Sequence, residues 1–99
     1  MILTQDHIQK IVVAYFKDKP VRKVWLFGSY ARGEADSDSD VDVVVEIDYR
    51  FEIGIEYFNW FQDLQEAFEK RVDVVTKKYI NNRLKPFIEK EMILMYEKD

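Results

Sequence analysis

The sequence predicts an α/β or α+β fold in which a small β-sheet carries helices packed on one face. Two observations lead to this expectation: apolar residues alternate with polar ones in some segments and recur at helical spacing in others. These segments follow one another without repeats or Pro/Gly-rich linkers. The 99 residues suffice for one hydrophobic core, so we expect a single domain over residues 1–99.

The first half of the chain predicts one helix followed by two strands. Apolar residues at helical spacing predict an amphipathic helix over residues 5–17. Residues 21–27 are apolar and rich in β-forming side chains, which is typical of a strand. Residues 41–47 alternate between apolar and other side chains, so this strand should present one apolar face and one face that carries acids.

The second half predicts two more helices and two more strands. Apolar residues at helical spacing indicate a long helix over residues 51–69, and residues 71–76 indicate a short strand. Apolar positions within 80–88 favour another helix, which Pro86 either starts or interrupts. The apolar run 92–96 predicts a final strand, with a helical continuation as the alternative.

Composition restricts the function and location of the protein. The formal net charge of −4 argues against direct nucleic-acid binding, because a phosphate backbone requires a basic face. The absence of cysteine excludes disulfides and thiolate metal sites and fits a reducing cytoplasm. No apolar run approaches the roughly 18 residues that span a bilayer, and the first residues do not resemble a signal peptide. We therefore expect a cytoplasmic protein with no membrane association.

A glycine–serine pair directly follows the strand predicted over residues 21–27. A turn into a short helix at Gly28 and Ser29 would present backbone N–H groups and a hydroxyl, which are suitable ligands for a phosphate group. Gly28 would let the backbone approach a ligand closely, and Gly33 would close the helical turn. The pair therefore marks a candidate phosphate-binding site.

The densest acidic stretch of the chain leads into the strand predicted over residues 41–47. Asp40 and Asp42 are two residues apart, so both carboxylates lie on one face, about 6–7 Å apart along the strand. Carboxylates at that separation repel each other unless a cation lies between them, and Mg²⁺ is the expected ion. Asp73 would face the same site if its strand paired beside residues 41–47. Three acids around one point suit two-metal phosphoryl transfer.

Simpler interpretations apply to some of these acids. Asp36 and Asp38 have no strand to orient them, and an Asp-rich stretch is most often a solvated loop. A calcium-binding loop that starts at Asp36 would require its sharp-turn glycine where Val41 stands. Asp73, taken alone, could instead be an ion-pair partner of Arg71.

The complete pattern resembles that of a known superfamily. Gly28-Ser29, ten intervening residues and Asp40-x-Asp42 resemble the signature of the DNA polymerase β-type nucleotidyltransferases. The fuller string over residues 28–33 and 39–42 is similar to the minimal nucleotidyltransferase (MNT) branch. The resemblance extends over most of the chain, because the segment around Asp73 and the final strand also fit that branch. It implies the nucleotidyltransferase fold, with a small mixed β-sheet.

The resemblance also implies a nucleotide site and a metal site. The implied nucleotide-binding residues are Gly28, Ser29 and Arg32. The implied metal ligands, which are also the candidate catalytic residues, are Asp40, Asp42 and Asp73. Asp73 would in addition help to deprotonate an acceptor hydroxyl. The expected cofactor is Mg²⁺, as two ions, and the expected substrate is ATP or another NTP.

MNT proteins typically pair with a HEPN-domain protein, often as the antitoxin of a HEPN ribonuclease toxin. The resemblance therefore implies transfer of AMP to a hydroxyl of such a partner. A free small-molecule acceptor is less expected, because the chain lacks the extra substrate-binding domain of larger relatives. The alternative is a non-catalytic antitoxin that neutralises its HEPN partner by occlusion. The complete set of acids argues against that alternative, since a degenerate member should have lost one.

Overall fold

The computed structural model describes residues 2–98 and contains a four-stranded mixed sheet with the strand order β3-β2-β1-β4. The strands are β1 (Val21–Phe27), β2 (Val41–Ile47), β3 (Val72–Thr76) and β4 (Ile93–Glu97). β1 pairs antiparallel with both β2 and β4, whereas β2 and β3 run parallel. The expectation of a small mixed sheet is therefore confirmed.

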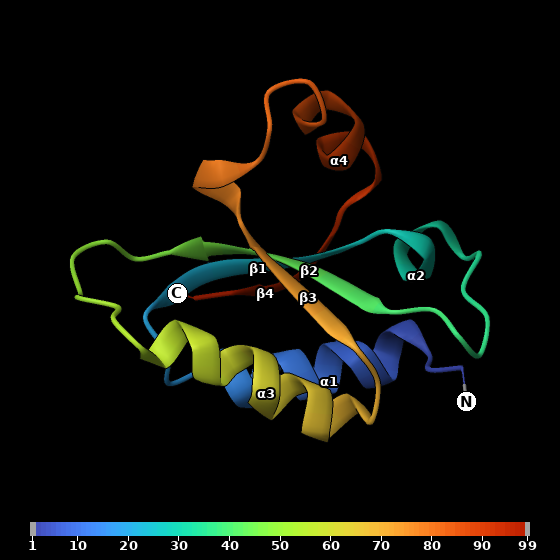
Figure 1. Ribbon diagram of the computed structural model, residues 1–99, viewed down its shortest axis with the longest axis horizontal. Coiled ribbons are helices and arrows are strands. Elements are labelled where there is room, and N and C mark those ends of the chain that lie inside the picture. The colour runs from blue at the N-terminus through green and yellow to red at the C-terminus, as the bar shows by residue number, and fades with distance from the viewer. Residues whose placement is uncertain (1, 99) are drawn as a thin grey trace.

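Two helices, α1 (Gln5–Phe16) and α3 (Glu56–Phe68), cover one face of the sheet (Figure 1). Their largest fully buried side chains are Phe16, Trp60 and Phe68, and the rings of Phe16 and Trp60 meet edge to face at 5.7 Å. These aromatic rings pack on the apolar face of β2, as its alternating pattern predicted. The two long helices thus lie on one face, as expected.

The other face of the sheet carries the segment between β3 and β4. This segment contains the 3₁₀ turn η1 (Lys77–Tyr79) and the short helix α4 (Lys85–Glu91), which stand on the opposite side from α1 and α3 (Figure 1). A small cluster of Trp25, Val44 and Ile80 lies below it, and Ile88 packs against this cluster. Pro86 stands in the first turn of α4, so of the two roles expected for it the structure shows the start of a helix.

The helix expected over residues 51–69 begins later than predicted, at Glu56. After β2 the chain first turns through Asp48, whose backbone C=O accepts a hydrogen bond from the N–H of Phe51 at 3.2 Å. Gly54, a poor helix former, follows in the same connection. Ile53 keeps helical spacing with the residues of α3, but it packs against the core from this connection. Within residues 2–98 no helix has the length and apolar character needed to cross a bilayer.

Candidate functional site

Two of the predicted acids lie side by side at one end of the sheet. In the parallel pairing of β2 with β3, Asp42 stands directly opposite Asp73. Neighbouring strands are about 4.8 Å apart, and in-register residues point to the same face. The condition that the sequence left open, pairing of the Asp73 strand beside β2, is therefore met. Both acids lie on the sheet face that carries α4.

Gly28 lies against the same carboxylate from the neighbouring strand. β1 ends opposite Asp42, with Phe27 as its partner, so the next residue, Gly28, begins its turn beside that side chain. Gly28 has a φ of 77°, a backbone conformation that favours glycine, and a Cβ atom there would collide with the Asp42 carboxylate. The glycine is therefore required both by its backbone conformation and by the close approach of Asp42.

The electrostatics of the site are those of uncompensated negative charge. Burial first, and then the charges of Asp73 and Asp40, together raise the pKa of Asp42 to about 6, against a lowering effect of Arg32. Within residues 2–98, none of these three acids forms an ion pair with a lysine or arginine. A divalent cation would relieve this repulsion, and carboxylate oxygens are the ligands that Mg²⁺ prefers.

The carboxylates are neighbours, but in the described part of the chain they do not form a preassembled group of three ligands as the side chains stand. Asp42 is half-buried, whereas Asp40 and Asp73 are exposed. Asp40 precedes β2 and also lines a shallow polar groove together with Lys70 and Arg71. The donor chemistry therefore fits a divalent cation, and the predicted ligand set stays a prediction.

The acids that precede Asp40 have a structural role. Asp36 accepts hydrogen bonds from the N–H of Asp38 at 2.9 Å and from the Ser39 hydroxyl at 3.2 Å. The Ser39 Oγ in turn accepts the N–H of Asp36 at 2.9 Å, which closes the loop on itself. Asp36 and Asp38 are exposed, as the solvated-loop interpretation predicted.

The predicted nucleotide-binding residues lie on the turn after β1. Ser29 and Arg32 are the first and last residues of the short helix α2 (Ser29–Arg32), and Gly33 follows it with a φ of 74°. The Arg32 guanidinium donates from Nε to Glu34 at 2.8 Å and from Nη1 to Glu91 at 3.2 Å. Gly28, Arg32 and Asp42 are thus brought together, and Ser29 lies between the first two in the chain.

Glu91, the last residue of α4, is a site residue that sequence reasoning missed. Its Oε1 also accepts the backbone N–H of Gly28 at 3.3 Å. Glu91 stands 63 positions from Gly28 in the chain and belongs to no motif. Its neighbours Glu89 and Lys90 are also charged, so nothing sets it apart in the sequence. No local pattern could have linked the two positions.

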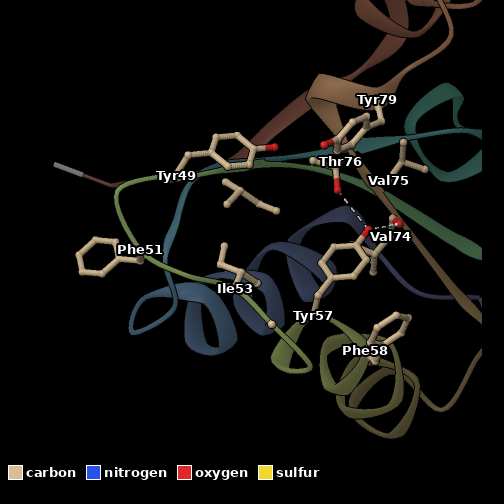
Figure 2. Close-up of a pocket in the computed structure, with 11 residues that line it drawn as sticks. Tyr49, Phe51, Ile53, Tyr57, Phe58, Val74, Val75, Thr76 and Tyr79 are labelled. Atoms are coloured by element: carbon tan, nitrogen blue, oxygen red, sulfur yellow. Dashed lines mark hydrogen bonds between the residues drawn. The ribbon is translucent and has the colours of Figure 1, made fainter.

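A groove of about 610 Å³ lies elsewhere on the described residues. It opens at the far ends of β2 and β3, and Figure 2 shows Tyr49, Tyr57 and Tyr79 around it. The Tyr57 hydroxyl donates to the Val74 C=O at 2.9 Å and accepts from the Thr76 hydroxyl at 3.2 Å. The groove contains none of the predicted site residues. The size of this groove therefore does not identify the functional site. The acids and the strand register at the other end of β2 are the better indication of where that site lies.

Comparison with known proteins places this chain among related sequences. It matches the nucleotidyltransferase domain family over residues 7–95. It is 41% identical over 78 residues to a protein of Methanocaldococcus jannaschii that is named, by inference, a protein adenylyltransferase. That match covers 77% of this chain and 75% of the relative.

Solved structures agree with the fold. One, described as an inferred minimal nucleotidyltransferase, is 28% identical with a TM-score of 0.72, over 89% of each chain. Another is a chain from the complex of a tri-AMPylated Shewanella oneidensis HEPN toxin with an MNT antitoxin. It has a TM-score of 0.72 at 18% identity, over 96% of this chain and 74% of that one, and at this identity the likeness concerns the fold alone.

Proposed function

The chain belongs to the nucleotidyltransferase domain family, and we propose that it transfers AMP from ATP to a hydroxyl group of a partner protein. The observation that carries this proposal is the meeting of unpaired acids at one point of the sheet. Asp42 and Asp73 stand in register on neighbouring strands, and Gly28 lies against the Asp42 carboxylate. We further propose that residues 1–99 act as one minimal nucleotidyltransferase domain.

Each residue has a distinct role in this proposal. Asp40, Asp42 and Asp73 hold Mg²⁺, and Gly28, Ser29 and Arg32 hold the phosphates of the nucleotide. When bound, two Mg²⁺ ions would supply positive charge to the attacking and leaving oxygens. The acceptor oxygen forms a bond to the α-phosphorus while the bond from that phosphorus to the bridging oxygen breaks, and pyrophosphate leaves. Asp73 helps to take the proton of the hydroxyl, because it is exposed on the open side of the site.

A protein acceptor suits the shape of the site. Asp40 and Asp73 are exposed, so the site is open on this side and a second molecule can supply the other wall. We propose a HEPN-domain protein as that partner and an antitoxin role for this chain. The relative from M. jannaschii, which is named a protein adenylyltransferase, supports a protein acceptor. The solved complex of an AMPylated HEPN toxin with an MNT antitoxin supports the class of partner.

The direct test incubates this protein with the candidate HEPN partner, Mg²⁺ and ATP, and follows the intact mass of the partner. We expect gains equal to whole AMP units. ATP labelled at the α-phosphate should label the partner, and ATP labelled at the γ-phosphate should not. An Asp42→Asn variant serves as the control without transfer. Neutralisation of the partner with unchanged mass would instead support occlusion by a non-catalytic antitoxin.

A further inference from the structure

Glu91 connects α4 to the turn that follows β1. Its Oε1 accepts the Gly28 N–H at 3.3 Å, and Arg32 Nη1 donates to Oε1 at 3.3 Å and to Oε2 at 3.2 Å. The Glu91 side chain is only 27% exposed. One carboxylate thus accepts from a backbone N–H and from a guanidinium group at the same time.

These two donors belong to the set assigned above to the nucleotide phosphates. A carboxylate and a phosphate oxygen are both anionic acceptors, and a guanidinium group binds either by charge-assisted hydrogen bonds. The other side of the Arg32 guanidinium is already bound to Glu34 at 2.8 Å. A triphosphate that accepts from both the Gly28 N–H and Arg32 Nη1 would therefore take the place of the Glu91 carboxylate.

We propose that Glu91 is an internal occupant of the phosphate site, which a nucleoside triphosphate displaces when it binds. This inference rests on the proposed function, because it concerns the same nucleotide site. The negative charge of Glu91 also adds to that of the neighbouring acids, so its presence opposes the approach of a triphosphate in two ways.

Displacement of Glu91 has a consequence for α4. This helix of seven residues has no buried residue, and Ile88 is half-buried against the cluster of Trp25, Val44 and Ile80. Besides this packing, the hydrogen bonds of Glu91 tie the C-terminal end of α4 to the turn that follows β1. When a nucleotide breaks them, the final turn of α4 loosens. Nucleotide binding is thereby coupled to the surface next to the open side of the site.

The test compares nucleotide affinity in the full chain and two charge-matched variants. Glu91→Gln keeps the size of the side chain and removes its charge. Glu89→Gln removes the same charge two residues away, where the carboxylate forms an ion pair with Lys85 at 3.9 Å. The ligand is α,β-methylene ATP with Mg²⁺, because the bond that AMP transfer would break is replaced in it. The dissociation constant is measured by calorimetry.

We expect Glu91→Gln to bind this analogue about tenfold more tightly and Glu89→Gln to bind it as the wild type does. The apparent dissociation constant scales with the inverse of the binding-competent fraction, so a tenfold gain means that Glu91 occupies the site in about nine molecules of ten. In an Arg32→Ala background the gain should be much smaller, because one of the two contested donors is gone.

A second readout follows the amides of α4 by hydrogen exchange. The analogue should speed exchange at the C-terminal turn of α4 in the wild type. In Glu91→Gln this turn should exchange quickly before any ligand is added. Slower exchange on binding in the wild type would contradict the loosening of α4.

The outcomes separate this inference from the proposed function. Equal affinity of wild type and Glu91→Gln would overturn the displacement while leaving nucleotide binding intact. Weaker binding by Glu91→Gln would overturn it too, because Glu91 would then support Arg32 as a phosphate ligand. A wild type and variants that all fail to bind the analogue would overturn the proposed function, and the inference with it.

Discussion

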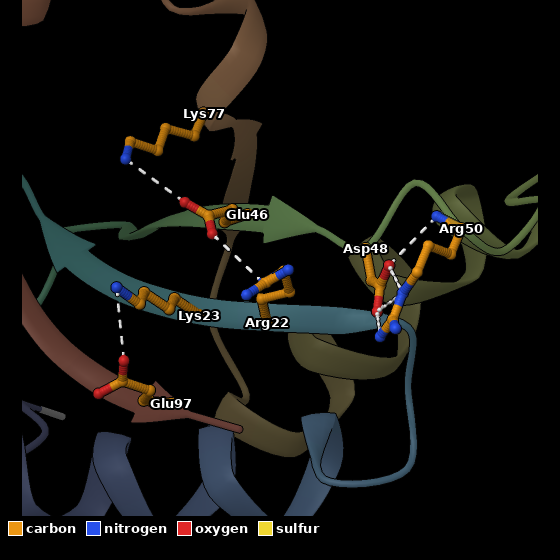
Figure 3. Close-up of polar contacts among 7 residues, drawn as sticks. All are labelled: Arg22, Lys23, Glu46, Asp48, Arg50, Lys77 and Glu97. Carbon is orange, nitrogen blue, oxygen red and sulfur yellow. Dashed lines mark hydrogen bonds and ion pairs between the residues drawn. The ribbon is translucent and has the colours of Figure 1, made fainter. Parts of the chain in front are cut away.

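Strand β2 carries acids at both ends, and among the described residues only those near its C-terminal end form ion pairs with cationic side chains. At its beginning, the Asp42 carboxylate lies beside Asp73 and has a raised pKa. Near its other end, Glu46 lies between Arg22 at 3.9 Å and Lys77 at 3.4 Å (Figure 3). Just beyond that end, Asp48 binds the Arg50 guanidinium at 2.7 Å, and these hydrogen bonds lower the pKa of Asp48 to about 2.

The contrast separates acids whose charge is compensated within the fold from the acids that we propose bind a ligand. Glu46 and Asp48 gain cationic partners, so their charge is compensated within the chain. Asp42 has no such partner in the described residues, and its burial next to other acids makes the charged form unfavourable. Such an arrangement costs stability, and perturbed acids of this kind are typical of functional sites.

Neutralising one acid at each end of β2 tests this difference most directly. We expect Asp42→Asn to reduce AMP transfer to the partner by at least about 100-fold, because it removes a charge that the transition state requires. Glu46→Gln, on the same strand and the same face, should leave transfer within about twofold. Steady-state rates of partner labelling measure both. Comparable losses in the two variants would contradict the division of roles.

Ligand binding should relieve the repulsion among the acids at the beginning of β2. With Mg²⁺ and a nucleotide at about 100 times the dissociation constant, the free energy of unfolding should rise by about 2.7 kcal/mol. In a domain of this size that corresponds to an increase of Tm on the order of 10 °C. Thermal unfolding of the wild type and of Asp42→Asn gives the measurement. No increase in the wild type at saturating ligand would argue against an intact site.

The raised pKa of Asp42 predicts a pH dependence of stability without ligand. A pKa of about 6 in the folded protein, against 3.8 unfolded, means that the folded state binds more protons between these values. The wild type should therefore lose stability relative to Asp42→Asn as the pH rises from about 4 through 6. Allowing for the partial exposure of the side chain, we expect on the order of 1 kcal/mol. A difference in Tm that stays constant over this range would contradict the raised pKa.

For Asp48 we predict the opposite pH dependence of stability. Because its pKa is lower in the folded protein than the unfolded value of 3.8, its ion pair stabilises the fold above that pH and is lost as the pH falls toward 2. Asp48→Asn should therefore lower Tm at neutral pH, with a difference from wild type that shrinks in acid. Transfer of AMP should be unchanged at a temperature where the variant is folded. Thermal scans at several pH values and a labelling assay test both statements.

The sequence by itself determined the parts that depend on local pattern. The bounds of β1 and β2 were predicted to the residue, because apolar and alternating side chains define a strand and its faces directly. The family also followed from local spacing, since the pair Gly28-Ser29 and the acids of Asp40-x-Asp42 stand close in the chain. The start of α3 was predicted less well, because Ile53 and its neighbours keep helical spacing within a connection that is not helical.

Only the tertiary structure decided which distant residues meet. The register of β2 against β3 sets Asp73 beside Asp42, and a shift of one residue would have turned it to the other face of the sheet. The position of α4 brings Glu91 to Gly28, 63 positions away in the chain. Periodicity reports which face a side chain occupies, but contacts between elements depend on pairing and crossover. These are settled by the packing of the whole core.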